Sequence, residues 1–448
     1  MLRLKPGRRF QYLRQGRALR VTLWAALVFA SSSESFGWDG DGAGDKEAAQ
    51  VPKQDEPAPE GWHRRRFALE RGASRVELTG FMQEDFRHFD WQVSGDTAGT
   101  KRYKARELRR IRLGFRARFG KTSFDFSAEP RDLPTGSRLK SLSASYAFSK
   151  AFGLRAGLFK LPGSKEFNAL TNGTDFPERS MIATRLVPER DWGIAASGLL
   201  GRVEYLAGVF KGDGSSSSRR TGLTSAGRVA VRVAKGLELS ASYLEGEVSA
   251  PSLVETAAAS PKGALGQTAT GFTFWSRPHV SGARRRVSSS LGYSRGPFRV
   301  LGEYLEEREG RESQSLVGQD LPDVFGRGWS AQASYVITGE TKAAIIEPAR
   351  SLFAGGAGAI EVVARVQTLR FDDAGDPFVP LSSGNRAANI PPVGASAIEA
   401  GVNYWPANFM KVQTSAIWEK YSDPLTAPTP GRPGRYLTLV ARVQFMIP

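Results

Sequence analysis

The chain has 448 residues, with 62 lysines and arginines against 45 aspartates and glutamates, three histidines and no cysteine. The lack of cysteine excludes disulfides, thiolate metal sites and cysteine nucleophiles, and three scattered histidines do not suggest a metal cluster. The formal charge of +17 favours an anionic partner, and at this level nucleic acid, anionic lipid and small anions are all open.

The first 37 residues have the pattern of a signal peptide. Seven basic residues up to Arg20 precede the apolar run Val21–Ala30, which is too short to span a bilayer. Small residues around Gly37 offer a cleavage site. A buried helix or a mitochondrial presequence is the alternative interpretation. We predict export, and the exported chain would still be basic.

Residues 38–74 are predicted to form a disordered periplasmic linker. The stretch "WDGDGAGDKEAAQVPKQDEPAPEG" is acidic and rich in Pro, Gly and Ala, and it has few side chains to bury. The basic run "HRRRF" follows, which either contacts lipid headgroups or is simply solvated. The chain therefore divides into residues 1–37, 38–74 and 75–448.

From Arg75 onward, segments of about 9–14 residues alternate apolar with polar or small side chains, which is the pattern of transmembrane strands. Short turns and long polar loops alternate between them. Strands are expected to begin near residues 75, 105, 122, 138, 152, 191, 202, 227, 237, 285, 298, 327, 358, 396, 408 and 434. We therefore predict an all-β fold, a 16-stranded antiparallel transmembrane β-barrel with short periplasmic turns and long extracellular loops.

Two segments do not fit the simple alternation. Residues 266–275 look like a strand, but a seventeenth strand would break the even count, so we place them inside the long loop 248–284. Residues 339–357 form a long connection on the short-turn side that the pattern does not explain.

A soluble β-sandwich also alternates, but it does not need aromatic side chains near its strand ends. Eight such residues suggest interfacial girdles instead. They are Phe81, Tyr146, Trp192, Trp275, Trp329, Tyr404, Trp405 and Trp418.

The stretch "RRIRLGFRARFG" (109–120) carries arginine at four even positions and apolar residues at the odd ones. Alternate side chains of a strand point to opposite faces. Arginine on the lipid side would cost about 2–4 kcal/mol at mid-depth. Arg110, Arg112, Arg116 and Arg118 are therefore expected to face the pore.

The same parity test places further cations in the lumen. They are Arg155, Arg228, Arg232, Arg365 and Arg442. Carboxylates occur on the same faces, so any one of these arginines could simply pair across strands and hold the wall.

Several stretches resemble the phosphate-selective porin O and P family of Gram-negative outer membranes. They include "RVELTGFMQEDF" (75–86), "LRAGLFKLPGSKEFNALTNGTDFPERS" (154–180), "RDWGI" (190–194), "GWSAQASYVITGE" (328–340), "AIEAGVNYWPANFMKVQTSAIW" (397–418) and "TLVARVQF" (438–445). The resemblance implies a sixteen-stranded barrel, usually trimeric, that conducts anions, with phosphate preferred in the best-known members. It also implies that the connection after "TGE" is a family feature. The chain departs from the family in ending "FMIP", and the family's phosphate-selecting cations cannot be matched individually.

Loop 163–190 is the candidate constriction element, because the resemblance implies that the loop in this place folds into the lumen. A solvated outer loop is the alternative. The cations assigned to the constriction are Lys160, Lys165, Arg179, Arg185 and Arg190.

These observations predict an outer-membrane porin for passive diffusion of small anions, with phosphate or polyphosphate as candidates. We expect lipid and further copies of the chain in a homotrimer as partners, and no cofactor, metal or nucleic acid. A closed barrel that binds or tethers is one alternative. An outer-membrane enzyme is another, although His88 and His279 belong to no recognisable hydrolase motif.

Overall fold

The computed structural model describes residues 63–65, 67–91, 106–130, 139–212, 222–249, 263–376, 378–382, 384–430 and 434–447. The predicted signal peptide and the first part of the predicted linker lie outside these ranges, so both stay predictions. None of the described helices has the length and apolarity needed to cross a membrane.

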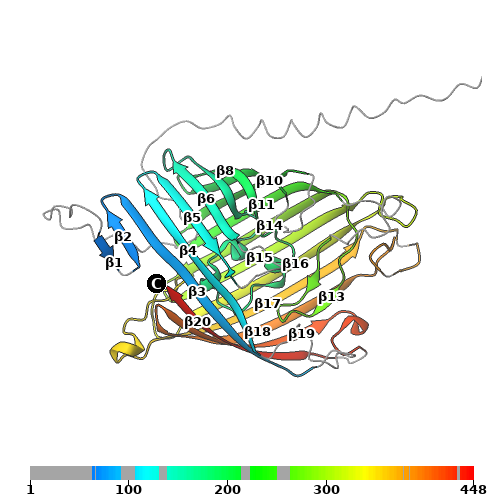
Figure 1. The fold of residues 1–448 in the computed structure, drawn as a ribbon. Coiled ribbons are helices and arrows are strands. Elements are labelled where there is room, and N and C mark those ends of the chain that lie inside the picture. The colour runs from blue at the N-terminus through cyan, green and yellow to red at the C-terminus, as the bar shows by residue number, and fades with distance from the viewer. Residues whose placement is uncertain are drawn as a thin grey trace, which may run out of the picture. The chain divides into compact units, whose positions relative to one another are not determined.

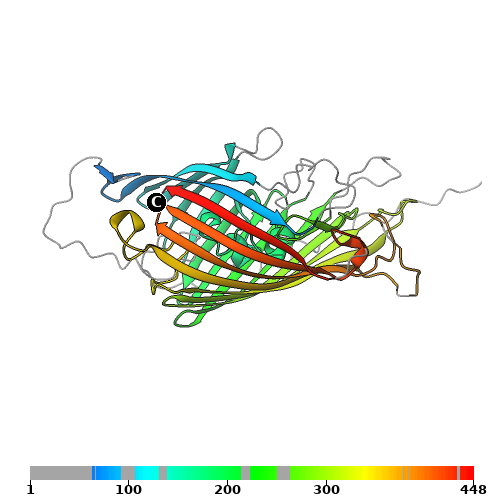
Figure 2. The same ribbon diagram turned by 90° about the horizontal axis from the view of Figure 1, so that it is seen from below.

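Sixteen antiparallel strands of the described chain close into a barrel (Figures 1 and 2). They are β3 (Ser74–Phe89), β4 (Arg106–Phe119), β5 (Thr122–Ala128), β6 (Leu139–Ala147), β7 (Gly153–Lys160), β8 (Arg190–Leu200), β9 (Val203–Phe210), β10 (Thr224–Ala234), β11 (Leu237–Val248), β14 (Gly282–Arg295), β15 (Phe298–Arg311), β16 (Leu321–Val336), β17 (Ala359–Asp373), β18 (Val393–Ala407), β19 (Met410–Tyr421) and β20 (Tyr436–Ile447). Each strand pairs with its neighbour, and β3 also pairs with β20, which closes the sheet. The predicted 16-stranded barrel is confirmed.

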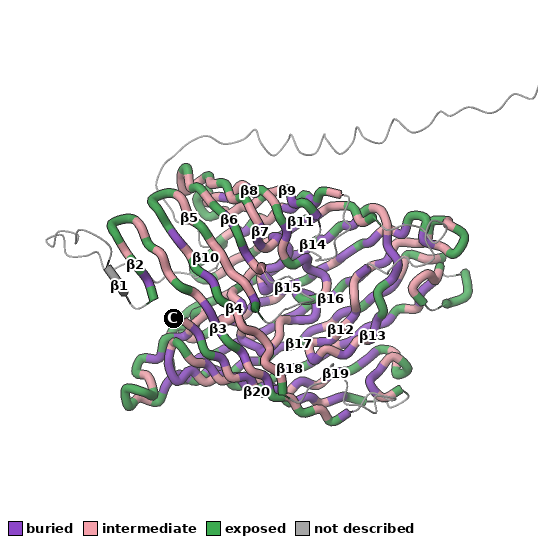
Figure 3. Tube along the Cα trace, viewed as in Figure 1, coloured by how far each residue is buried: buried purple, intermediate pink, exposed green. Residues whose placement is uncertain are grey.

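The side chains alternate between an apolar exterior and a polar interior, and Figure 3 shows the alternation as buried and exposed steps along the strands. On β17, Val362 and Val366 are exposed, whereas Glu361 and Arg365, the residues directly before them, are buried. A water-soluble sandwich would bury the valines and expose the charges. The reversed pattern fits a barrel in lipid, because only closed sheets satisfy their backbone hydrogen bonds there.

Short turns lie at one end of the barrel and long loops at the other, as the sequence predicts. Two-residue turns join β4 to β5 and β10 to β11, and Gly120 and Gly236 supply the positive φ angles of 58° and 81° that these turns need. The short-turn end is the periplasmic end of an outer-membrane barrel, and the long-loop end is extracellular.

Residues 63–65 and 68–71 form two paired strands, which corrects part of the predicted disordered linker. β1 (His63–Arg65) pairs with β2 (Ala68–Arg71), and β2 pairs with the first residues of β3. β20 covers β3 only from Gly80 onward. The start of β3 therefore offers free backbone groups that β2 satisfies, a long-range pairing that linker composition does not reveal.

The structure accounts for the two segments, residues 266–275 and 339–357, that do not fit the simple alternation of the sequence. Residues 266–275 form the separate two-stranded sheet of β12 (Gly266–Gln267) and β13 (Thr273–Trp275) inside the long loop, as placed. The connection 337–358 contains η3 (Leu352–Ala354) and sends Ile346 against Trp405 and other inward-facing side chains. It therefore closes part of the periplasmic mouth.

Three of the eight predicted girdle aromatics face the interior instead. Phe81 and Trp405 lie on the inward parity of β3 and β18 and pack with Ile346, while Trp275 stacks on Phe371 at 5.2 Å. Tyr146, Trp192 and Trp329 are exposed on the outer surface, where a girdle requires them.

Candidate functional site

Residues 161–189, called here the inner loop, connect β7 to β8 and fold into the barrel. They contain α1 (Lys165–Asn168), η2 (Thr171–Gly173) and α2 (Met181–Arg185). Serine caps start both α-helices: Ser164 Oγ accepts from the N–H of Phe167 at 3.0 Å, and Ser180 Oγ accepts from the N–H of Ala183 at 3.3 Å. These local signals make a compact insert rather than the solvated loop of the alternative interpretation.

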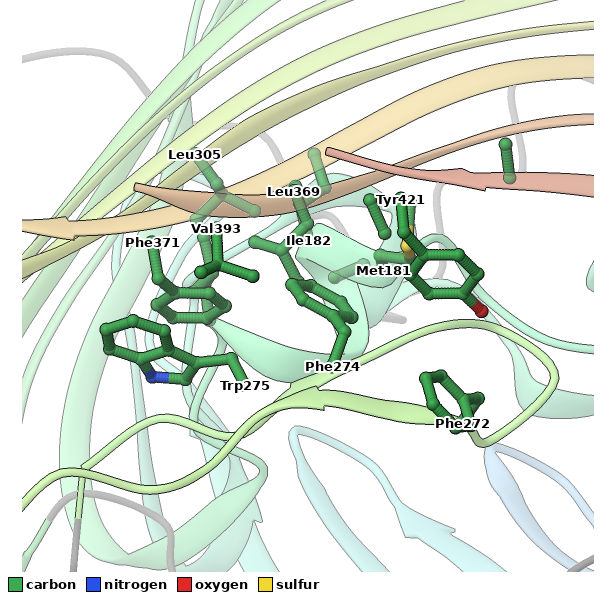
Figure 4. Close-up of a cluster of buried hydrophobic side chains, with 14 of the residues drawn as sticks. Met181, Ile182, Phe272, Phe274, Trp275, Leu305, Leu369, Phe371, Val393 and Tyr421 are labelled. Carbon is green, nitrogen blue, oxygen red and sulfur yellow. The ribbon is translucent and has the colours of Figure 1, made fainter. Parts of the chain in front are cut away.

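Apolar packing holds α2 against the wall and against the hairpin β12–β13. Met181 and Ile182 are fully buried, and Figure 4 shows them beside Phe274 and Leu369. The wall makes room for the helix with glycine, since a Cβ at Gly328 would lie 2.7 Å from the Ile182 side chain. The inner loop is thus anchored on the β15–β17 side of the lumen.

Ion pairs anchor the acidic side chains of the inner loop to cations of the wall and of the connection 337–358. Asp175 binds Arg299 at 2.5 Å and Lys342 at 2.7 Å, while Glu166 lies 3.3 Å from Arg365. Burial alone would raise the pKa of Asp175, but the two cations outweigh it and hold this pKa below its usual range. The carboxylates of Asp175 and Glu166 are therefore occupied by the protein itself.

Glu178 is the most shared of these carboxylates. It accepts from Arg109 at 2.7 Å, from Arg442 at 3.0 Å and from Arg110 at 3.4 Å. Burial opposes ionisation, but the three guanidinium groups hold the pKa of Glu178 well below its usual range. Three arginines therefore share the single negative charge of Glu178.

A cavity of about 390 Å³ opens beside this group, between β3–β4, the inner loop and residues 267–271 of the hairpin. Its cationic lining is Arg87, Arg109, Arg110, Arg179 and Arg185, and its acidic lining is Glu107, Glu178 and Glu189. Burial lowers the pKa of Arg185 to about 10, which still leaves it charged at neutral pH. The cavity is polar and carries more positive than negative groups.

Arg110, Arg112, Arg116 and Arg118, called here the β4 arginines, all lie on the lumen side of β4. Arg110 donates to Gln83 at 3.1 Å as well as to Glu178, and Arg112 donates to Glu129 at 2.9 Å and to Thr171 at 3.3 Å. Towards the periplasmic end the pairing weakens. Arg116 lies 3.5 Å from Asp125, and Arg118 is exposed opposite Arg75.

The other predicted lumen cations separate into open and covered groups. Arg155 donates to Ser143 at 3.0 Å, Arg228 lies 3.2 Å from Glu238, and Arg232 is exposed at the periplasmic end. Arg365 and Arg442 face the interior, but they do not line the open passage, because their side chains have no exposed surface. Pairing with the inner loop, which parity cannot show, covers both.

The predicted constriction cations surround the inner loop in different roles. Lys160 donates to three backbone carbonyls of residues 167–169, and Lys165 donates to Glu238 at 2.8 Å. Arg179 donates to the carbonyls of Glu166 and Ala169, and Arg185 donates to that of Gln267. Arg190 lies within electrostatic reach of Arg112. Lys160 thus supports the loop, whereas Arg179 and Arg185 line the cavity.

The sequence analysis did not single out two cavity arginines, Arg87 and Arg109, and strict alternation fails only for Arg109. The register between β3 and β4 shifts at Gln83 and Glu84, so that Arg109 lies in a β-bulge and reaches Glu178 on the lumen side. Arg87 has the inward parity of Asp85, and their side chains bond at 2.8 Å. The doubled arginine at 109–110 is the one sequence signal that could have suggested a bulge.

A family model described as phosphate-selective porin O and P matches residues 76–447, almost the whole barrel. The chain belongs to this family. The porin is therefore an outer-membrane protein, and the family indicates a channel rather than an enzyme. No curated protein sequence matches it.

Solved structures share the fold of this porin at low sequence identity. An outer-membrane protein of Vibrio cholerae, OmpT, is 9% identical with a TM-score of 0.53, covering 85% of this chain and 99% of its own. The outer-membrane channel DcaP of Acinetobacter baumannii is 10% identical with a TM-score of 0.51, covering 84% and 98%. An anion-selective porin from Comamonas acidovorans is 14% identical with a TM-score of 0.50, covering 84% and 100%. At these identities the likeness concerns the fold alone.

Proposed function

We propose that this porin forms a water-filled, arginine-lined channel for passive diffusion of small anions across the outer membrane. The cavity beside the inner loop carries the proposal. Five arginines and three glutamates line it, and the most buried of those carboxylates, Glu178, is already shared among several guanidinium groups. An entering anion therefore meets net positive charge.

Arginine suits this task because it stays charged at any working pH and offers a planar fork to phosphate or carboxylate oxygens. A contact near 4 Å is worth about 1 kcal/mol in bulk water and about 4 kcal/mol at an effective dielectric constant of 20. Conduction needs contacts that permit both entry and release. Many of the lumen arginines already contact a carboxylate, which moderates the attraction.

The proposed pathway runs from the extracellular loops to the periplasmic turns. Arg185 and Arg179 offer the first contacts at the cavity, Arg110 and Arg112 continue along β4, and the exposed end of β4 with Arg118 leads out. Such a series lets an anion pass between neighbouring sites of modest depth, whereas one deep site would trap it.

Phosphate and polyphosphate are the proposed candidate substrates, and a homotrimer is the proposed assembly. The family to which the chain belongs is described as phosphate-selective, and a protein of the same fold is named an anion-selective porin. The guanidinium-rich cavity is chemically suited to phosphate, and it would also accept other small oxyanions.

Single-channel recording of the purified porin in planar bilayers tests the proposal. We expect discrete steps in KCl and a reduction of the chloride current when phosphate is added. Chloride steps without phosphate block would keep the anion channel and reject phosphate as a substrate. A complete lack of steps would favour the closed, binding barrel instead.

A further inference from the structure

The outer surface of β11 and β14–β17 carries charged side chains close to its extracellular edge. The strand register aligns them in rows. The row nearest the loops holds Glu245, Arg285, Arg308, Phe325 and Asp372, and the next row holds Tyr243, Val287, Glu306, Arg327 and Arg370. One step further towards the membrane, Tyr304 stands opposite Trp329. The charges therefore lie directly above the aromatic residues of the extracellular girdle.

Four arginines of these rows, called here the headgroup belt, point outward. They are Arg285, Arg308, Arg327 and Arg370. Their side chains are 44–56% exposed, whereas Arg284 and Arg286, which flank Arg285, are almost fully buried in the lumen. The same short segment of β14 thus presents guanidinium groups to both sides of the wall.

The belt places like charges directly opposite one another. Arg285 faces Arg308 across β14 and β15, and Arg327 faces Arg370 across β16 and β17. Such pairs destabilise a sheet. Inside the chain, Arg327 and Arg370 reach the same carboxylate, that of Asp372, at 2.5 and 3.3 Å, and Glu306 lies opposite Arg327.

The other pair keeps much of its hydrogen-bonding capacity. Arg285 donates to Glu245 at 2.8 Å and Arg308 donates to Asp323 at 2.6 Å, both through Nε. A guanidinium has four further N–H groups. An anion held between two opposed guanidinium groups would receive charge-assisted hydrogen bonds from both and would convert their repulsion into attraction.

We propose that the headgroup belt binds the phosphate groups of lipids in the outer leaflet. The position of the belt selects this occupant, since it faces lipid at the level where headgroups lie. Arginine is tolerated there, at about 0–1 kcal/mol near the interface against about 2–4 kcal/mol at the midplane. An uncharged headgroup would leave the guanidinium repulsion in place. The barrel would therefore prefer phosphorylated lipid at this edge.

Binding of two lipids by the full-length porin in detergent, followed by native mass spectrometry, tests the proposal. The first probe is a lipid whose headgroup is an acylated glucosamine disaccharide with two phosphate groups. The second probe is the same lipid without the phosphate groups. The test variant is R285Q/R308Q. The matched control is R295Q/K235Q, which removes two charges at the short-turn end, where Arg295 shares the outer face of β14 with Arg285.

We expect the porin and the control variant to prefer the phosphorylated lipid by at least about tenfold, and the test variant to lose about tenfold, equivalent to about 1.4 kcal/mol. R285K/R308K, which keeps the charge but not the fork, should bind between the two. Equal binding of both lipids by the wild-type porin would overturn the proposal. So would a test variant that binds as before, or one that changes only the oligomeric state, which would assign this face to a second copy. Unchanged channel conductance verifies that each variant is folded.

Discussion

Glu178→Gln changes the balance of charge at the cavity with the least change of shape. The carboxylate is bonded to Arg109, Arg110 and Arg442 and is only 15% exposed. A glutamine can still accept through its amide oxygen, and Glu166 and Asp175 continue to anchor the inner loop. The substitution therefore removes one negative charge and leaves the arginines in place.

The expected effect follows from Coulomb's law. For an anion about 6 Å from this carboxylate, the repulsion removed is about 0.7 kcal/mol in bulk water and about 3 kcal/mol at an effective dielectric constant of 20. These values correspond to roughly threefold and roughly a hundredfold in binding. Phosphate should therefore block the chloride current at concentrations at least about threefold lower than in the wild-type porin, and phosphate should leave the site more slowly.

The assay is phosphate block of single-channel chloride current in planar bilayers. Glu77→Gln is the matched control, because Glu77 also faces the lumen and lies 3.9 Å from Arg116, at the periplasmic end and outside the cavity. It should leave the block nearly unchanged. Unaltered or weaker block in Glu178→Gln, with a normal open conductance, would show that the cavity does not bind the permeating anion.

Further predictions concern the wall, the inner loop and pH. Replacing all four β4 arginines by serine should lower the preference for anions in reversal-potential measurements, and unchanged selectivity would make that strand structural. Lys342→Met should make the open current noisier, because Asp175 loses a partner 2.7 Å away; a quiet trace would contradict this anchoring role. Gly328→Val should displace α2 and change the conductance, since even a Cβ would lie 2.7 Å from Ile182 and still closer to the backbone oxygen of Thr368; unaltered conductance would contradict the tight docking. The lowered pKa values of Asp175 and Glu178 make the stability they contribute fully present above their ordinary pKa values of 3.8 and 4.5, and this stability is lost only as the pH falls further through the lowered values. In an NMR titration of the side-chain carboxyl carbons, neither Asp175 nor Glu178 should become protonated between pH 7 and about pH 4, and protonation of either one already at pH 5 would contradict the assignment.

The strand pattern could be predicted from the sequence because one local rule governs it. Lipid outside and polar groups inside impose a period of two on every strand, and glycine marks the short turns. Parity was therefore sufficient to place all four β4 arginines on the lumen side. It failed at Arg109, where one extra residue in the strand shifts the register without any change in composition.

The contacts of the inner loop could not be predicted, because they join residues distant in the chain. Nothing local in the sequence pairs Glu178 with Arg442 or Asp175 with Lys342, yet these contacts decide which cations are covered. Arg365 and Arg442 look like pathway residues by parity and become loop anchors in three dimensions. The hairpin β1–β2 was missed for the same reason, since the uncovered start of β3 exists only once the barrel has closed.

The reversal potential of the wild-type porin in a KCl gradient tests the central claim most directly. A lumen with surplus guanidinium groups should give a potential whose sign corresponds to chloride passing more readily than potassium. A potential of the opposite sign, with potassium preferred, would contradict the account, because the carboxylates of the lumen would then outweigh the arginines.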